Sequence, residues 1–200
     1  RLYYLPIAIA LGVLTACGGD QSGAPAGDTP AQAPEPATTQ EPAAPAVSAP
    51  PARAVLINRE GQEVGEITFT QEGNNVVIEV NGRNFEGGPK AVHIHAVGQC
   101  EPPDFASAGD HFNPDNREHG LDNPNGPHAG DLPNLEVDPD FGVLEGTFRT
   151  DRVTLVDGQP NSLFDADGSA IVVHARGDDG TTQPSGNSGD RVACGVIVRA

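Results

Sequence analysis

Basic residues are scarce in this sequence. It has 11 lysines and arginines against 28 acidic residues, a formal net charge of −17, and Lys90 is its single lysine. So acidic a surface repels the phosphates of nucleic acid and the head groups of anionic lipids, which argues against both as partners. A small anionic substrate would reach this protein only through a locally positive site.

Long apolar runs and helical patterns are also missing. The apolar run from Leu2 to Leu14 is too short to span a bilayer as a stable helix. No stretch of useful length has the 3.6-residue period of an amphipathic helix. We therefore expect a fold built from strands.

The N-terminal segment has the features of an export signal. The apolar run ends in Leu14-Thr15-Ala16-Cys17, which resembles a bacterial lipobox. We predict that residues 1–17 form a signal peptide, that Cys17 is lipidated, and that the protein is exported to the cell envelope or periplasm. A secretory signal with an incidental cysteine is the alternative. The thin basic segment and the absence of an initiator Met lead us to expect that the sequence lacks its first residues.

Residues 18–53 are rich in proline and alanine and contain few large apolar side chains. Such a segment cannot bury enough surface to offset its chain entropy, so we predict a disordered, extended tether. The tether would separate a lipid anchor, the only membrane contact that we expect, from a folded domain. That domain is predicted to span residues 54–200.

The composition of residues 54–200 predicts an all-β domain. Short β-prone runs alternate with turn residues, and several alternate apolar with polar side chains, as half-buried strands do. The runs are Ala54–Asn58, Glu66–Thr70, Val76–Val80, Ala91–Val97, Val143–Thr150, Val153–Leu155, Ile171–Ala175 and Val192–Val198.

The region between Val97 and Val143 has almost no strand pattern. A loop of this length inside a compact domain is normally functional, or is held by something other than a core. Three of the six histidines of the chain, His111, His119 and His128, lie in it. We take this as a first indication of a metal site.

Two cysteines, Cys100 and Cys194, remain after Cys17. In an exported protein such a pair is expected to form a disulfide. Closing so long a loop would stabilise the fold by roughly 4–5 kcal/mol in the chain-entropy model. Thiolate metal ligands and a redox-active pair are the alternatives.

The other histidines also lie where metal ligands could lie. His93 and His95 would project from the same side of one strand, because side chains alternate with period two. His174 ends an apolar run, and His128 and Asp131 are three residues apart in a turn-rich segment. Each feature alone is a weak signal, since surface and buried neutral histidines occur in such places. Together they favour a metal centre.

These residues carry a family resemblance. The chain is similar to Cu,Zn superoxide dismutases over about residues 54–200, on these motifs: His93-x-His95, Cys100, His111-Phe-Asn-Pro, His119-Gly, Gly-Pro-His128-Ala-Gly-Asp131-Leu-Pro-Asn, Val-Val-His174 and Gly-Asn-Ser-Gly-Asp-Arg191-Val-Ala-Cys194-Gly-Val-Ile. The resemblance implies a flattened eight-stranded Greek-key β-barrel with a long metal-binding loop and a short active-site loop.

The resemblance also implies one copper, one zinc and a reaction. The implied ligands are His93, His95, His111 and His174 for copper, and His111, His119, His128 and Asp131 for zinc. His111 would bridge a redox-cycling copper and a structural zinc, and two superoxide anions and protons would become O₂ and H₂O₂. Imidazole suits both metals, and three histidines with one carboxylate are an acceptable zinc site.

Two further residues take roles from the resemblance. Arg191 matches the family's anion-guiding arginine, and Asp178 matches the carboxylate that hydrogen-bonds one copper and one zinc histidine. The segment from Ala175 to Asp190 lacks the Lys/Glu cluster of longer members, so we expect attraction of superoxide to be local. A non-catalytic copper- or zinc-binding lipoprotein and an interaction lipoprotein stabilised by metal are the alternatives. A homodimer stays open, since one sequence does not identify a pairing face.

Overall fold

The computed structural model describes residues 49–200. The expected signal peptide, the lipidation site at Cys17 and the tether up to residue 48 lie outside this part of the chain. The described residues form an all-β fold whose one short helical element is the 3₁₀ turn η1, Ala106–Ala108. Within residues 49–200, no helix is long and apolar enough to cross a membrane.

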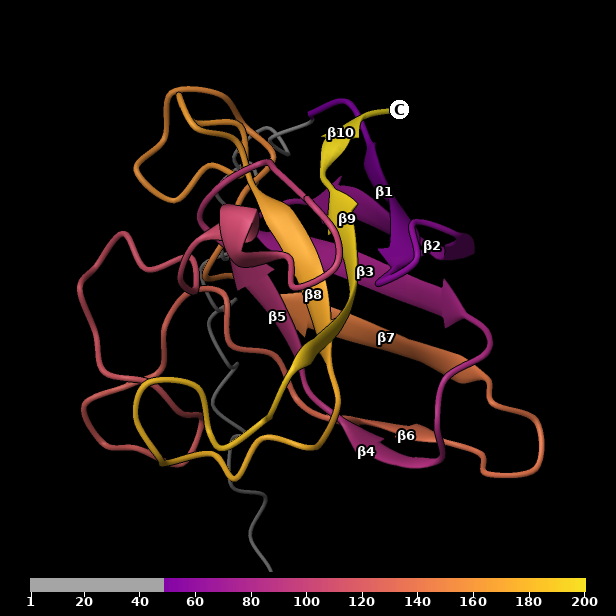
Figure 1. The fold of residues 1–200 in the computed structure, drawn as a ribbon. Helices are drawn as coiled ribbons and strands as arrows, with labels where there is room; N and C mark the ends of the chain where they lie inside the picture. The colour runs from indigo at the N-terminus through magenta and orange to yellow at the C-terminus, as the bar shows by residue number, and fades with distance from the viewer. Residues whose placement is uncertain (1–48) are drawn as a thin grey trace, which may run out of the picture. The chain divides into compact units, whose positions relative to one another are not determined.

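The strands form one antiparallel sheet (Figure 1). In chain order they are β1 Ala52–Asn58, β2 Glu63–Glu72, β3 Asn75–Gly82, β4 Gly88–Lys90, β5 Val92–His95, β6 Leu135–Val137, β7 Leu144–Thr150, β8 Ala170–His174, β9 Arg191–Val196 and β10 Val198–Arg199. Their order in the sheet is β4-β6-β7-β3-β2-β1-β9-β8-β5, with β10 paired to β1. Neighbours in the sheet are thus often distant in the chain, as a Greek-key topology requires.

The sheet curls into a nearly closed barrel because its two end strands, β4 and β5, are consecutive in the chain. Only Ala91 separates them, and its N–H donates to the carbonyl of Arg176 while its carbonyl accepts from His174 N–H. β9 and β10 are likewise separated by one residue, Ile197. With each of these pairs counted as one interrupted strand, the ten strands become the eight strands of the expected barrel.

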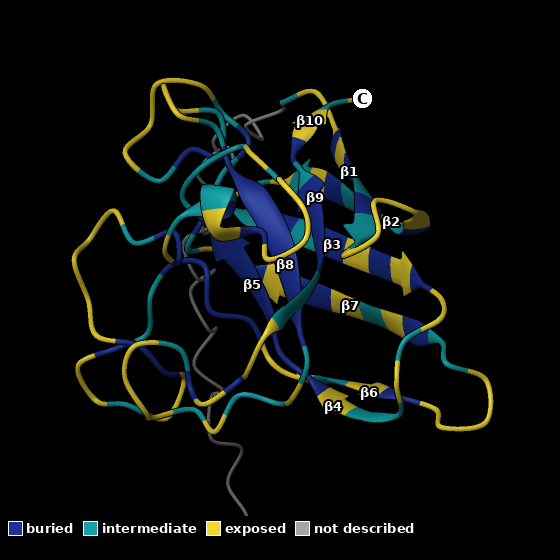
Figure 2. Ribbon diagram, in the orientation of Figure 1, coloured by how far each residue is buried: buried dark blue, intermediate teal, exposed yellow. Residues whose placement is uncertain are grey.

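Alternation along the strands fills the barrel (Figure 2). Ile67 and Phe69 of β2 are fully buried, and their neighbours on the other face of the strand are partly or fully exposed. β3 pairs Ile78 with Phe69 and Val80 with Ile67, so large side chains meet across the strands inside the barrel. β8 differs because all five of its residues are buried. It packs on the main core by one face and under a loop by the other.

The prediction of a strand at Val153–Leu155 is wrong. Val153–Leu155 makes only a single bridge, between Thr154 and Ser162, although Val153 and Leu155 are fully buried. The N–H of Leu155 donates to the side-chain oxygen of Gln71 instead of to the backbone carbonyl of a neighbouring strand. The run is apolar because its side chains enter the core, and burial alone does not imply strand pairing.

The structure also adds pairing that the composition did not predict. β6 lies inside the region with almost no strand pattern and is flanked by Pro133 and Pro139. It pairs with β4. β1 begins at Ala52, before the expected domain boundary at residue 54. Ala52 packs in the core, but alanine is also common in the predicted tether. The composition therefore did not place the start of the domain at this residue.

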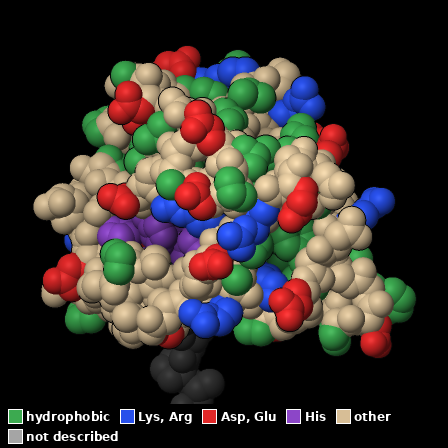
Figure 3. All heavy atoms as spheres, in the orientation of Figure 1, with side chains coloured by type: hydrophobic (Ala, Val, Ile, Leu, Met, Phe, Trp, Pro, Cys, Tyr) green, Lys and Arg blue, Asp and Glu red, His purple; other side chains and the backbone are tan. Residues whose placement is uncertain are grey.

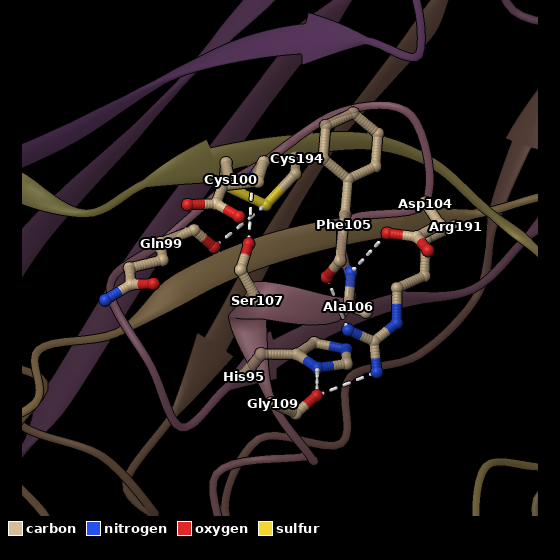
Figure 4. The surroundings of a disulfide bond; sticks show 11 residues. His95, Gln99, Cys100, Asp104, Phe105, Ala106, Ser107, Gly109, Arg191 and Cys194 are labelled. Carbon is tan, nitrogen blue, oxygen red and sulfur yellow. Dashed lines mark hydrogen bonds between the residues drawn. A yellow bond between two sulfur atoms is a disulfide. The ribbon is translucent and has the colours of Figure 1, made fainter.

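The expected disulfide between Cys100 and Cys194 is present, with Cα atoms 5.7 Å apart (Figure 4). It joins the loop that follows β5 to β9. Cys194 is fully buried in a second, smaller core cluster with Phe105, Ala108 and Val172. The disulfide therefore fixes the loop around η1 against the outer face of the β8–β9 pair.

Candidate metal centre

β5 divides its side chains between the core and the histidine cluster. Val92 and Ile94 are part of the main core, and His93 and His95 project from the other side of the strand. His93 is 0% and His95 1% exposed. The period-two prediction for this strand is confirmed, and it brings two buried imidazoles to the edge of the barrel.

The long loop between β5 and β6, which we call the metal-binding loop, is hydrogen-bonded to β5 around Ile94. Ile94 N–H donates to Gly130 O at 2.9 Å, and Phe112 N–H donates to Ile94 O at 2.8 Å. Isolated bridges then pair His95 with His111 and His93 with Asp131. A Cβ at position 130 would collide with the Ile94 carbonyl, so this close approach requires glycine.

The seven residues expected to bind metals come together in two groups that share His111. In each group the candidate ligand atoms lie within 4.8 Å of one another. The groups are His93, His95, His111 and His174, and His111, His119, His128 and Asp131. The rings of His93 and His111 are 4.1 Å apart between centroids, which makes the two groups one continuous cluster.

The ring nitrogens of this cluster fit metal binding. Five of them are buried and have no hydrogen-bond partner among the described residues: His93 Nδ1, His95 Nε2, His111 Nε2, His119 Nδ1 and His174 Nε2. Buried polar atoms are rarely left without partners, so such a group of imidazole nitrogens needs an explanation. A copper ion on the first group and a zinc ion on the second would satisfy all five.

Asp131 is oriented by the backbone. Its Oδ2 accepts the N–H groups of Gly120 at 3.0 Å and His128 at 2.9 Å. Its Oδ1 is thereby directed at His111 Nδ1, 2.8 Å away, and at His119 Nδ1, 3.1 Å away. Burial favours the neutral acid, but hydrogen bonds from the histidines more than offset it and hold the pKa of Asp131 far below its usual range.

Asp178 connects the two groups. Its carboxylate lies 2.8 Å from His93 Nε2 and 3.0 Å from His119 Nε2. Asn134 fixes the backbone of Asp178 by two hydrogen bonds, since its Nδ2 donates to Asp178 O at 2.9 Å and its Oδ1 accepts from Asp178 N–H at 2.8 Å. Asp178 therefore lies between one copper-side and one zinc-side histidine, where the resemblance placed it, and its role stays a prediction. A carboxylate in this position fixes the tautomer and the orientation of ligand imidazoles.

The histidines differ in their affinity for protons. Burial lowers the pKa of His111 to about 4, although its hydrogen bond to Asp131 opposes this. Burial and the neighbouring His93 lower the pKa of His174 to about 3. His119 is the exception, because the carboxylates of Asp131 and Asp178, both close to its ring, outweigh its burial and raise its pKa to about 9. The neutral rings of His111 and His174 are ready to act as ligands, since a metal binds deprotonated imidazole.

Arg191 shares a hydrogen-bond acceptor with the cluster (Figure 4). Its Nη2 donates to Gly109 O at 2.7 Å, and His95 Nδ1 lies 2.9 Å from the same oxygen. Nη1 donates to Phe105 O at 2.6 Å. Two carbonyls of the disulfide-bound loop therefore hold the guanidinium beside the ring of His95. Burial lowers the pKa of Arg191, and the nearby Asp110 and Asp104 oppose this.

A hollow of about 400 Å³ lies against this arginine. Its lining includes Arg59 and Arg191, and also Asp104, Asp110 and Asp190. Figure 3 shows histidine side chains reaching the surface in one patch, with Lys or Arg side chains beside them and acidic side chains around them. Gly109 and Gly189, whose carbonyls contact His95 and His174, also line this hollow. A larger hollow, about 1050 Å³, lies over β2, β3 and β7, and its lining contains none of these residues. The smaller one is thus the candidate substrate entrance.

Sequence reasoning missed the residues that position the cluster. Gly109 and Asn134 lie near candidate ligands in the sequence, and the left-handed φ of 73° at Gly109 has no signal beyond the glycine itself. Arg59 lies in the β1–β2 turn, where Nη1 is 3.4 Å from Asp190. Only the tertiary structure brings that turn to the hollow.

The raised pKa of His119 predicts a pH effect on the metal-free protein. Its pKa of about 9 lies above the ordinary value of 6.5, so its ion pairs stabilise the fold fully below pH 6.5 and are lost as pH rises through 9. We expect the melting temperature of metal-free protein to fall by several degrees over this interval. Zinc-loaded protein should show no such fall, because zinc replaces the proton. Calorimetry of both forms tests this, and a pH-independent melting temperature of the metal-free form would contradict it.

Known proteins resemble this chain. A family model described as copper/zinc superoxide dismutase matches residues 63–197. The chain is 43% identical over 145 residues to "Superoxide dismutase [Cu-Zn] 1" of Aquifex aeolicus, covering 72% of this chain and 85% of that protein. It is 44% identical over 146 residues to the "Superoxide dismutase-like protein YojM" of Bacillus subtilis, covering 72% and 74%. A solved structure of a "SOD-like protein from Bacillus subtilis" superimposes with a TM-score of 0.70 at 41% identity, covering 73% and 97%. These matches confirm the resemblance, and the chain belongs to the copper/zinc superoxide dismutase family.

Proposed function

We propose that this protein is an active superoxide dismutase with one copper and one zinc per subunit. The observation that carries the proposal is the pair of ligand groups joined at His111, with unpartnered ring nitrogens directed into both. A zinc-only module would not need His93, His95 and His174. When bound, copper would supply the one-electron redox chemistry that zinc lacks.

His111 is suited to hold and deliver a proton. Its Nδ1 faces Asp131 on the zinc side, and its Nε2 belongs to the copper-side group. Reducing one superoxide to H₂O₂ consumes two protons, and Nε2 is a position from which one can be given.

Arg191 would bind the anionic substrate beside this proton source. The carbonyls of Phe105 and Gly109 hold its guanidinium in place. The guanidinium lies next to His95, at the edge of the copper-side group. A guanidinium stays charged at any physiological pH. It therefore supplies the local positive site that a chain of net charge −17 needs for a small anion.

Metal content and superoxide consumption, measured together, test the proposal. After loading with copper and zinc, the purified protein should hold both metals and consume superoxide. His174→Ala should lose copper and activity and keep zinc, because His174 belongs only to the copper-side group. If wild-type protein takes up zinc alone and is inactive, the enzyme hypothesis is wrong. That result would favour a metal-binding or interaction lipoprotein.

The role of Arg191 has its own test. Arg191→Ala should lower kcat/KM by about tenfold and flatten its dependence on ionic strength, since the local field at the entrance is lost. Arg53→Ala removes the same charge from an exposed position in β1 that does not line the hollow, and it should leave both quantities unchanged. An unchanged rate and salt slope in Arg191→Ala would reject this role.

We also propose that the protein is exported and held in the cell envelope by a lipid on Cys17. The lipobox-like sequence supports this, as does the Cys100–Cys194 disulfide, because such bonds persist in oxidising compartments. Cys17→Ser, expressed from the full chain, should move the protein from the membrane fraction to the soluble fraction. Membrane association that survives the substitution would refute lipidation at Cys17.

A further inference from the structure

Gln183 makes an unusual pair of contacts. It lies in the active-site loop, residues 175–190, and its side chain holds the backbone of His119. His119 N–H donates to Gln183 Oε1 at 2.9 Å, and Gln183 Nε2 donates to His119 O at 2.9 Å. Gln183 as a residue is exposed and adds nothing to the core. Both ends of its amide nevertheless bond to His119, 64 positions earlier in the chain, and Nε2 also donates to Thr181 O at 3.2 Å.

The backbones of the two loops also meet at His119. Asp122 N–H donates to Gly180 O at 3.0 Å. Gly186, with φ of 63°, passes directly over the contact between Asp178 and His119, where a Cβ would collide with the Asp178 carboxylate. The active-site loop therefore surrounds His119, with Gln183 on its backbone and Asp178 on its ring.

We propose that Gln183 is a positioning residue for zinc, which fixes His119 in the orientation that lets Nδ1 act as a ligand. The ring of His119 has Nδ1 3.1 Å from Asp131 Oδ1 and Nε2 3.0 Å from Asp178 Oδ2. These distances fix the ring only if the backbone that carries it is also fixed. The inference rests on the proposed zinc site and does not depend on superoxide turnover.

The role of Gln183 is specific to the zinc side. The copper-side rings are oriented by other groups: Asp178 for His93, Gly109 O for His95, and Gly189 O with Ser188 Oγ for His174. None of these contacts involves Gln183. Removing its amide should therefore weaken zinc binding selectively, whereas a general loosening of the barrel would weaken both metals.

Gln183→Ala tests this directly. In competition with a chromophoric chelator, the full-length variant should bind zinc about 10- to 100-fold more weakly than wild type, as is typical when a group that orients a ligand is lost. Copper retention, measured at saturating zinc, should match wild type. Gln159→Ala, which truncates an exposed glutamine outside both loops, is the matched control and should bind both metals normally. With cobalt in place of zinc, the visible absorption bands of Gln183→Ala should shift, because they report ligand geometry.

The outcomes separate this inference from the proposed function. Wild type that binds zinc, with a Gln183→Ala variant of equal affinity and an unchanged cobalt spectrum, would overturn the role of Gln183 and leave the centre intact. An equal loss of copper and zinc, with a lower melting temperature of the metal-free variant, would overturn it in favour of a purely structural role. Wild type that retains no zinc would overturn both.

Discussion

The metal centre depends on the backbone hydrogen bonds of Ile94. Its side chain is fully buried in the barrel, and its N–H and carbonyl bind Gly130 and Phe112 of the metal-binding loop. Gly130 N–H also donates to Phe112 O, so the stretches of the loop around Phe112 and Gly130 are bonded to each other as well as to β5. One strand residue thus sets the relative positions of three ligand-bearing segments. The barrel supplies rigidity, and the loop acquires it without a core of its own.

Charge at the entrance is arranged over a short range. Three aspartates and two arginines line the hollow, and Arg59 lies within ion-pair distance of Asp190. The field outside such an entrance does not attract an anion, and the acidity of the whole chain opposes its approach. Arg191 works differently because it is half-buried and bound to carbonyls, so its charge is little screened by water. In the proposed function, attraction of superoxide would therefore be confined to the last few ångströms, beside the copper-side group.

Short-range features of the sequence correctly predicted the alternation of side chains in β5 and the Cys100–Cys194 disulfide. Period two separated Ile94 from His93 and His95, and two cysteines in a chain expected to be exported predicted the disulfide. The division of the histidines between two metals came from the family resemblance. Pattern failed where burial and pairing diverge, as in Val153–Leu155, and where prolines flank a short strand, as in β6. Gln183 gave no signal, and Asn134 stood in a family motif without a role, because their partners lie far away in the sequence.

The active-site loop joins the two ligand groups mechanically. Asp178 contacts His93 and His119 through one carboxylate, and the same loop reaches His174 through Gly189 O and Ser188 Oγ. A metal that orders this loop on one side therefore also orders ligands on the other. Coupling of this kind is reciprocal, so any free energy by which zinc favours copper binding equals that by which copper favours zinc. A zinc ion held by the second group would thus act on the copper-side group through the loop as well as through His111, which belongs to both groups.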